Sequence, residues 1–269
     1  MSVFPSEICF YGCGNMGSAM LRGWLASGVT ADRFFVVDPK ADGLPQDVSL
    51  YLSSQEVERK FDILLLGIKP QLLPELASDI AQLLAPGAIV ISILAGTRTA
   101  TLSTAFPEAQ VVRLMPNLAA AIGKSPLALF APQADIPARN MLETLLAPLG
   151  SVIWIEDEGH MDAVTALAGS GPAFVYRFID ALAKGGEAAG LPRDIAAHMA
   201  IAMTEGAAIL AASSGQTPED LAARVTSPGG TTAAGLGVLD ANGALDILVR
   251  ETLRAARDRG TELARGDTK

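Results

Sequence analysis

Short apolar runs alternate with amphipathic stretches from the start of the chain to about residue 156. Two of the amphipathic stretches, Gln71–Leu84 and Ala138–Leu149, have the spacing of helices. Strands that are apolar throughout and separated by helices are typical of a mostly parallel sheet covered on both faces. The pattern predicts an α/β fold, with a Rossmann-like doubly wound sheet over residues 1–156. The runs expected to form its strands are Ile8–Tyr11, Phe34–Val37, Ile63–Ile68, Ala88–Leu94, Val111–Leu114, Leu127–Phe130 and Val152–Ile155.

The pattern changes after Asp157, where the strand-like runs stop and only helical periodicity follows. Alanine is frequent here, and small residues let helices approach closely. So short a helical segment with many apolar side chains along its helices is expected to bury part of that surface in another subunit. We therefore predict an all-α, substrate-binding and dimerisation domain over residues 157–269, in a homodimer or larger homo-oligomer. Its helices are expected to break at Ser170–Pro172, Gly190–Pro192, Gly215–Pro218, Ser227–Gly230 and Asn242–Gly243.

Composition narrows the class of protein. The mean hydropathy is positive, at +0.34, but no stretch approaches the roughly 18 uninterrupted apolar residues of a membrane span. Residues 1–11 lack the basic start and long apolar core of a secretory signal, so we expect a cytoplasmic protein without a membrane partner. A net charge of −9 argues against a nucleic-acid partner. With only two cysteines and two histidines, neither a disulfide framework nor a metal site is expected.

A glycine-rich segment directly follows the first predicted strand and opens a helix that runs to about Ser27. In this context the three glycines permit a tight turn, a close approach of a pyrophosphate to the backbone, and packing of the helix on the sheet. The free N–H groups and the dipole at the helix start favour phosphate. We predict a dinucleotide site, NADPH or NADH, at Gly12, Cys13, Gly14, Asn15, Met16 and Gly17.

The second predicted strand ends at Asp38, about 20 residues after the glycines. An acidic residue there can accept hydrogen bonds from the ribose hydroxyls of NAD and repel the extra phosphate of NADP. Lys40 could instead attract that phosphate. The choice between NAD and NADP therefore stays open, with Asp38 favouring NAD.

Two other predicted strands end at the edge of the sheet where parallel strands meet a ligand. One ends in Gly67, Ile68, Lys69 and Pro70, and the other runs through Met115 and Pro116 to Asn117. Lys69 follows a buried run directly, where a lysine is costly unless it meets solvent or an anion. These residues are candidates for the cofactor end of a site.

A second glycine-rich segment, Val225–Thr232, precedes the helical stretch Ala233–Leu239. Ser227 is a plausible helix cap and Pro228 suits a turn. Gly229 and Gly230 leave backbone N–H groups uncovered for a carboxylate, and Thr231 and Thr232 add hydroxyl groups. Such a cradle would let an acidic protein bind a small anion. An ordinary turn between helices is the alternative interpretation.

The usual acid–base residues of a dehydrogenase are missing from these segments. No Ser/His/Asp arrangement is apparent, and His160 and His198 are expected at a domain boundary and on a helix surface. A reductase with few proton-transfer groups suits a substrate that arrives activated, such as a protonated imine. The protein then needs only to position the two partners and exclude water.

Seven segments, taken in order, resemble the pyrroline-5-carboxylate reductase family over nearly the whole chain. The most specific is the Ser-Pro-Gly-Gly-Thr-Thr core at 227–232. The segments are Gly12–Gly17, Ile68–Gln71, Ser92–Gly96, Met115–Asn117, Gly169–Phe174, Gly190–Arg193 and Val225–Leu236.

The resemblance implies reduction of 1-pyrroline-5-carboxylate to L-proline with NADPH or NADH. It also implies a dimer with exchanged helices, in which one subunit's nucleotide domain faces its partner's helical domain, and a further assembly such as a decamer. By position, the backbone around Gly229, Gly230 and Thr231 would hold the substrate carboxylate. Thr232 would hydrogen-bond the ring nitrogen, and Lys69, Pro70 and Asn117 would line the cofactor end.

One departure bears on the substrate. The family usually continues Met-Pro-Asn with Thr-Pro, whereas this chain has Leu118-Ala119. The loss of a hydroxyl group and a rigid proline could admit another cyclic imine, including a six-membered one. A catalytically silent module that senses dinucleotides is a further alternative, motivated by the scarcity of acid–base residues.

Overall fold

The structure is a computed structural model, and it describes residues 7–264. The first six residues of the segment expected to lack a secretory signal lie outside this range. The chain divides into two compact units. One runs to Gly169 and takes up the end of the chain from Arg257, and the other is Ser170–Ala256.

The first unit is built on an eight-stranded sheet with the order β3-β2-β1-β4-β5-β6-β7-β8. Every neighbouring pair is parallel except β6 and β7. The doubly wound sheet and all seven expected strands are confirmed. The strands are β1 (Ile8–Tyr11), β2 (Phe34–Val37), β3 (Ser49–Tyr51), β4 (Phe61–Leu66), β5 (Leu84–Ser92), β6 (Gln110–Met115), β7 (Ser125–Phe130) and β8 (Gly150–Trp154).

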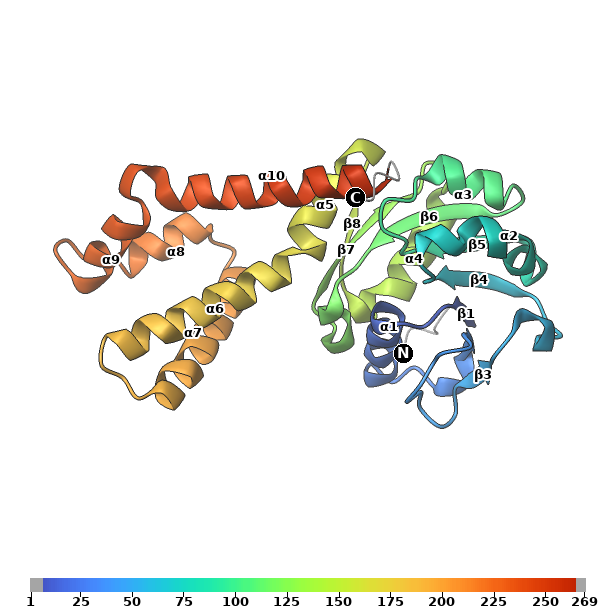
Figure 1. Cartoon of the computed structure of the whole chain (residues 1–269), viewed down its shortest axis with the longest axis horizontal. Helices are drawn as coiled ribbons and strands as arrows, with labels where there is room; N and C mark the ends of the chain where they lie inside the picture. Colours follow the sequence, from blue (N-terminus) through green and yellow to red (C-terminus); the bar gives the residue numbers. More distant parts are fainter. Residues whose placement is uncertain (1–6, 265–269) are drawn as a thin grey trace. The chain divides into compact units, whose positions relative to one another are not determined.

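Helices cover both faces of this sheet (Figure 1). Alternate strand residues point to opposite sides, so one set packs with α1 and α4 and the other with α2 and α3. Trp24 of α1 lies in the first layer, and its Nε1 donates to the carbonyl of Leu145 in α4 at 2.7 Å. Both faces are therefore buried, which explains why the strands are apolar throughout.

The helical elements of the first unit are short connectors around four longer helices. The longer ones are α1 (Asn15–Ala26), α2 (Leu73–Gln82), α3 (Thr99–Ala105) and α4 (Ile136–Leu146). The connectors are η1 (Ala31–Arg33), η2 (Ser54–Glu56), η3 (Pro70–Leu72), η4 (Leu118–Ile122), η5 (Ala147–Leu149), η6 (Glu158–His160), α5 (Met161–Val164) and the π-helical η7 (Thr165–Gly169).

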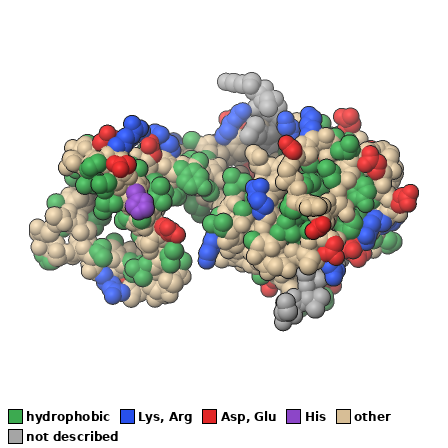
Figure 2. Space-filling view, turned by 90° about the horizontal axis from the view of Figure 1, so that it is seen from below, with side chains coloured by type: hydrophobic (Ala, Val, Ile, Leu, Met, Phe, Trp, Pro, Cys, Tyr) green, Lys and Arg blue, Asp and Glu red, His purple; other side chains and the backbone are tan. Residues whose placement is uncertain are grey.

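The second unit is entirely helical, as predicted, but it has almost no core of its own. Between Ser170 and Ala256 only Ala196 and Ala200 are buried. Apolar side chains lie among the charged ones on its surface (Figure 2), and Phe178, Met199 and Ile209 are each about half exposed. The helices are α6 (Gly171–Ala188), α7 (Arg193–Ser213), α8 (Pro218–Arg224), α9 (Thr231–Leu239), η8 (Ala241–Gly243) and α10 (Ala244–Ala264), the last of which continues into the first unit.

The contact between α1 and η4 gives a stability prediction. A Cβ on Gly23 would overlap the carbonyl oxygen of Ala120 and lie 2.7 Å from Cδ2 of Leu149. A helical Gly→Ala change normally stabilises, but here we expect Gly23→Ala to destabilise by about 1–3 kcal/mol through overpacking. Urea unfolding followed by the fluorescence of buried Trp24 measures this. Arg22→Ala, at an exposed position of the same helix, is the control, and a Gly23→Ala protein as stable as wild type would contradict the packing described.

Candidate functional site

The turn after β1 is closed by a contact that only glycine allows. Gly12 has φ +87°, and a Cβ there would lie 2.8 Å from the backbone carbon of Gly67. The reverse also holds, because a Cβ on Gly67 would lie 2.6 Å from the carbonyl oxygen of Gly12. The backbones that leave β1 and β4 therefore touch. Both glycines were predicted site residues, and the structure brings them together.

The start of α1 is open and suits a dinucleotide diphosphate. Gly14 is the N-cap residue, and no side chain caps the helix. A Cβ on Gly14 would meet no atom within 4 Å, whereas one on Gly17 would be 3.4 Å from the carbonyl oxygen of Gly12. Gly14 thus borders free space and Gly17 packs inward, which are the two roles expected of these glycines. The N–H groups of the first turn, around Asn15 and Met16, are available to phosphate oxygens.

Asp38 lies against the same loop. Its Oδ2 accepts a hydrogen bond from the backbone N–H of Cys13 at 2.8 Å, and its Oδ1 accepts one from the N–H of Lys40 at 2.8 Å. The carboxylate that follows β2 therefore holds the glycine turn, and Lys40 is exposed beside it. The predicted cofactor residues of the first two strands form one cluster.

The two cysteines near this cluster are not nucleophiles. Burial raises the pKa of the Cys9 thiol to about 12 and also raises that of Cys13. Both thiols are therefore protonated at neutral pH, and the thiolate is the reactive form.

The other predicted cofactor residues lie at the carboxyl ends of β4 and β6. Ile68 follows Gly67, and Lys69 is exposed at the start of η3, which begins at Pro70. This is the edge at which parallel sheets bind ligands. The structure thus leaves the Lys69 side chain accessible at the expected edge.

Hydrogen bonds hold both the backbone and the side chain of Asn117. Its N–H donates to Oγ of Ser125 at 2.9 Å, its Oδ1 accepts from the N–H of Ala119 at 2.9 Å, and its Nδ2 donates to the carbonyl of Ala168 at 3.0 Å. The residue is 8% exposed. It therefore caps η4 and fastens the π-helical segment to the end of β6, while its predicted contact with the cofactor stays a prediction.

The second glycine-rich segment forms a tight turn before α9. The N–H of Gly230 donates to the carbonyl of Ser227 at 3.0 Å, and Gly229 has φ +68°. Proline followed by a left-handed glycine is the sequence of a type II turn. The N-cap residue of α9 is Gly230, without a side-chain cap, so the prediction that Ser227 caps the helix is wrong. Ser227 instead lies over Gly230, where a Cβ would be 2.5 Å from its Oγ.

This arrangement leaves the start of α9 accessible. Thr231 and Thr232 are exposed, and the backbone N–H groups of the first turn have neither helical nor side-chain partners. A small carboxylate can bind such a turn.

Sequence reasoning missed a polar network in the first unit. Arg113 in β6 is 5% exposed, and its Nη1 lies 2.7 Å from Oε1 of Glu158. Glu158 also accepts from the N–H of Thr99 at 2.8 Å and from its hydroxyl at 3.0 Å. These residues come from three segments that are separate in the sequence, so no local spacing predicts the network. The one available signal is an arginine inside the apolar run of β6.

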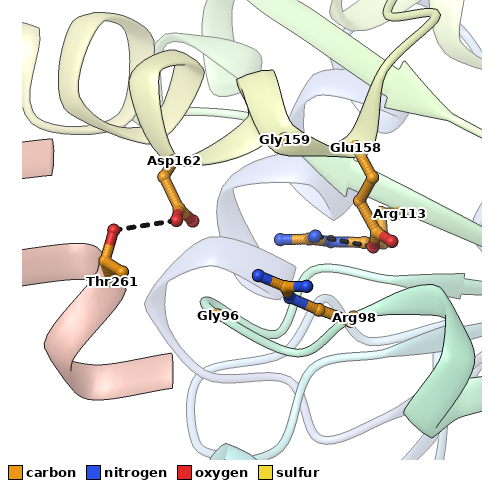
Figure 3. Close-up of a pocket in the computed structure, with 7 residues that line it drawn as sticks. All are labelled: Gly96, Arg98, Arg113, Glu158, Gly159, Asp162 and Thr261. Atoms are coloured by element: carbon orange, nitrogen blue, oxygen red, sulfur yellow. Dashed lines mark hydrogen bonds and ion pairs between the residues drawn. The ribbon is translucent and has the colours of Figure 1, made fainter. Parts of the chain in front are cut away.

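The network borders a small pocket of about 160 Å³. Figure 3 shows the guanidinium groups of Arg98 and Arg113 in it, with Asp162 hydrogen-bonded to Thr261 at 3.0 Å on another side. Partial burial acts to raise the pKa of Glu158. The hydrogen bonds from Arg113 and Thr99, with the charge of Arg113, outweigh burial and hold the pKa below its ordinary value.

Comparisons with known proteins cover both units. Residues 158–263 match the family model described as pyrroline-5-carboxylate reductase dimerisation, and residues 7–96 match NADP oxidoreductase coenzyme F420-dependent. Pyrroline-5-carboxylate reductase of Pseudomonas aeruginosa is 35% identical over 96% of this chain and 97% of its own length. The chain belongs to the pyrroline-5-carboxylate reductase family.

Solved structures of the family agree. A pyrroline-5-carboxylate reductase from Coxiella burnetii has a TM-score of 0.88 at 30% identity and covers 96% of this chain and 98% of its own. A Plasmodium falciparum pyrroline carboxylate reductase with NADP bound has a TM-score of 0.85 at 25% identity and covers 97% and 99%. The fold expected from the resemblance is therefore confirmed.

Membership of this reductase family also accounts for the exposed apolar helices. Two helical stretches, Arg193–Ser213 and Thr231–Glu262, are long and apolar enough to cross a membrane by length and composition alone. Both lie within the residues matched to the dimerisation model, so self-association explains their apolar surface. The match supports a homo-oligomer.

Substitutions at Gly12 and Gly14 separate folding from cofactor binding. We expect Gly14→Ala to fold normally, since its Cβ enters free space, but to weaken NADPH binding on the order of tenfold, about 1.4 kcal/mol, because the methyl group occupies the diphosphate's approach. Gly12→Ala is expected to destabilise the fold against Gly67. Fluorescence titration with NADPH, with thermal melting in parallel, distinguishes the two. An unchanged affinity of Gly14→Ala for NADPH would contradict the assignment of the diphosphate to this turn.

Proposed function

We propose that this protein reduces 1-pyrroline-5-carboxylate to L-proline, using NADPH or NADH. The observation that carries the proposal is the match to pyrroline-5-carboxylate reductases over nearly the whole length of both chains. The two glycine-rich helix starts give that reaction the two anion-binding sites it needs.

The cofactor site is formed by the first unit. When bound, NAD(P)H supplies the hydride that adds to the carbon of the C=N bond. The first turn of α1 binds the diphosphate, and Asp38 holds Cys13, and with it the glycine turn, in place. Lys69 and Asn117 line the cofactor end in this proposal. The choice between the two cofactors depends on Asp38 and Lys40, which lie side by side.

The substrate site is formed by the turn at 227–232. The backbone around Gly229, Gly230 and Thr231 binds the carboxylate, although the N–H of Gly230 already donates to the carbonyl of Ser227 and is not a free donor. Oγ1 of Thr232 accepts a hydrogen bond from the protonated ring nitrogen. Backbone dipoles allow a chain with a net charge of −9 to bind this acid without a local excess of cations. No general acid is required, because the imine nitrogen already carries its proton and keeps it as the amine forms.

The active site is proposed to be shared between subunits. Residues 1–156 bind the cofactor, and residues 157–269 supply substrate binding and dimerisation, although the compact units divide after Gly169. Subunits exchange helices in a homodimer, so the α9 turn of one completes the site of its partner, and dimers can associate further into a decamer. The nearly coreless second unit, with only Ala196 and Ala200 buried, supports this proposal. We infer that the enzyme works in the cytoplasm.

A second candidate substrate is a larger cyclic imine. Leu118 follows the Asn117 that ends the β6 segment, and its side chain is 56% exposed at the edge where ligands bind. An accessible leucine offers apolar contact to an additional ring methylene. A preference of more than about tenfold in kcat/KM for 1-pyrroline-5-carboxylate over the six-membered analogue would remove this candidate.

The main assay compares the two cofactors. We expect oxidation of NADPH and NADH, followed by absorbance, to depend strictly on 1-pyrroline-5-carboxylate and to yield proline in equal amount. Reactions without imine are the control. A purified protein that binds NADPH but produces no proline would contradict the proposal and favour a dinucleotide sensor.

A pair of threonine variants tests the substrate turn. Thr232→Val removes the hydroxyl group at nearly constant volume, so we expect kcat/KM to fall by about 10²-fold, the effect of losing one directed polar contact at a reacting centre. Thr231→Val keeps the backbone N–H that is proposed to bind the carboxylate, so its activity should stay within about threefold, or about 0.65 kcal/mol. Equal effects of the two substitutions would contradict the role of Thr232.

A further inference from the structure

Arg113 is a buried charge that neither the cofactor site nor the substrate turn uses. An arginine taken out of water is costly unless its partner is well placed, and such pairs rarely add net stability. Its partner, Glu158, comes from the segment that follows β8, about 45 residues later in the chain. A buried ion pair that joins two distant segments fixes the position of one segment against the other more than it stabilises the fold. The residues that contact this pair therefore show which part of the structure it positions.

Glu158 links this pair to a third segment. Oε1 accepts from both Arg113 and the N–H of Thr99, and Oε2 accepts from the Thr99 hydroxyl. Thr99 is the first residue of α3, and no side chain caps that helix at Arg98. One carboxylate therefore holds the end of the loop at 93–98, which connects β5 to α3.

The same loop begins beside Gly67, which contacts the glycine turn proposed to bind the cofactor. The N–H of Ile93 donates to the carbonyl of Leu66 at 3.1 Å, which continues the pairing of β5 with β4. A Cβ on Gly67 would lie 3.5 Å from Cδ1 of Ile93 on one side and 2.6 Å from the carbonyl oxygen of Gly12 on the other. The backbone of the loop therefore joins Thr99, which is bonded to Glu158, to Ile93, which is bonded to Leu66 beside Gly67.

We propose that Glu158 is a positioning residue for the cofactor: with Arg113 and Thr99 it holds the β5–α3 loop where Gly67 and Gly12 form the diphosphate turn. This inference rests on the proposed use of NAD(P)H. Glu158 itself touches neither reacting partner. It acts through backbone position at the carboxyl edge of the sheet, where small shifts change ligand affinity.

The hydrogen bonds from Arg113 and Thr99, with the charge of Arg113, set the pH dependence of Glu158. Arg113 from β6, Arg98 before α3 and Asp162 of α5 line the same pocket. Since the pKa of Glu158 is lowered in the folded protein, its contribution is complete above the ordinary glutamate pKa. That contribution is lost only as the pH falls through the lowered value. The loop should hold its position at neutral pH and loosen in acid.

The first test uses two glutamates of the same segment. Glu158→Gln leaves Arg113 without a charged partner, and we expect Kd for NADPH to rise roughly 3- to 30-fold, with KM for NADPH rising in parallel and kcat at saturating NADPH little changed. Glu156→Gln is the matched control, because Glu156 is 79% exposed and its contact with Arg139 is 3.7 Å. Kd is measured by fluorescence, so the test does not depend on imine reduction.

The second test changes the pKa of Glu158 without removing the residue. Thr99→Val deletes one hydrogen bond that favours the carboxylate, so the pKa of Glu158 should rise. The acid-side loss of NADPH affinity should then begin at a higher pH than in wild type. A network that serves only stability would leave that pH profile unmoved. This variant also serves if Glu158→Gln does not fold.

The outcomes separate the two proposals. The positioning role is supported if Kd for NADPH rises in Glu158→Gln and stays unchanged in Glu156→Gln. It also requires that NADPH affinity is lost at a higher pH in Thr99→Val than in wild type. The role is overturned if folded Glu158→Gln protein binds NADPH with the wild-type Kd. It is also overturned if Thr99→Val loses NADPH affinity at the same acid pH as wild type. A protein that binds NADPH tightly but reduces no imine contradicts the proposed function and leaves this test intact.

Discussion

The first turn of a helix leaves its backbone N–H groups without partners inside the helix, and two such turns organise this molecule. At α1 and at α9 the residue before the helix is glycine, and no side chain caps either start. Uncovered N–H groups carry partial positive charge, so they can bind an anion in a chain whose net charge is −9. Both turns depend on glycine, because Gly12 and Gly229 have positive φ and Gly14 borders free space.

The order of the strands makes the glycine turn before α1 depend on other parts of the sheet. Because β1 lies beside β4, and β4 beside β5, the ends of these strands meet at one edge. Gly12 and Gly67 touch there, so neither strand can shift without moving the diphosphate turn. The polar network around Glu158 extends the same constraint to α3 and β6. At Gly12 and Gly67, stability and the shape of the cofactor turn therefore depend on the same contact.

The sequence predicted the parts of the fold that depend on local chemistry. The seven apolar strands, the helix that begins within Gly12–Gly17 and the breaks between the later helices all follow from periodicity and glycine or proline placement. Strand β3 was missed because it has only three residues, none of them buried. Ser227 was mistaken for a cap because a serine before a helical run usually is one; here its carbonyl closes a turn and the helix begins later.

The hydrophobic pattern of the sequence does not predict polar contacts between residues that are far apart in the chain. The place of Asn117 at a strand end predicts a ligand contact, but it does not predict that the side chain also bonds to Ala119 and Ala168. The bonds between Glu158, Arg113 and Thr99 depend on how segments 45 and 59 residues apart come together. The apolar surface of the helical unit was, by contrast, predictable from its periodicity, and the match to the dimerisation model supports the self-association expected from it.

The central claim is that two uncapped helix starts bind the two anionic ligands. Amide chemical-shift mapping of the isotope-labelled oligomer tests it most directly, with NADP⁺ and a non-reactive cyclic carboxylate analogue of proline added separately. The account predicts that NADP⁺ shifts the amides of residues 12–17 most strongly and that the carboxylate shifts those of residues 229–232. Largest shifts at other helix starts, or none at either turn under saturation, would contradict it.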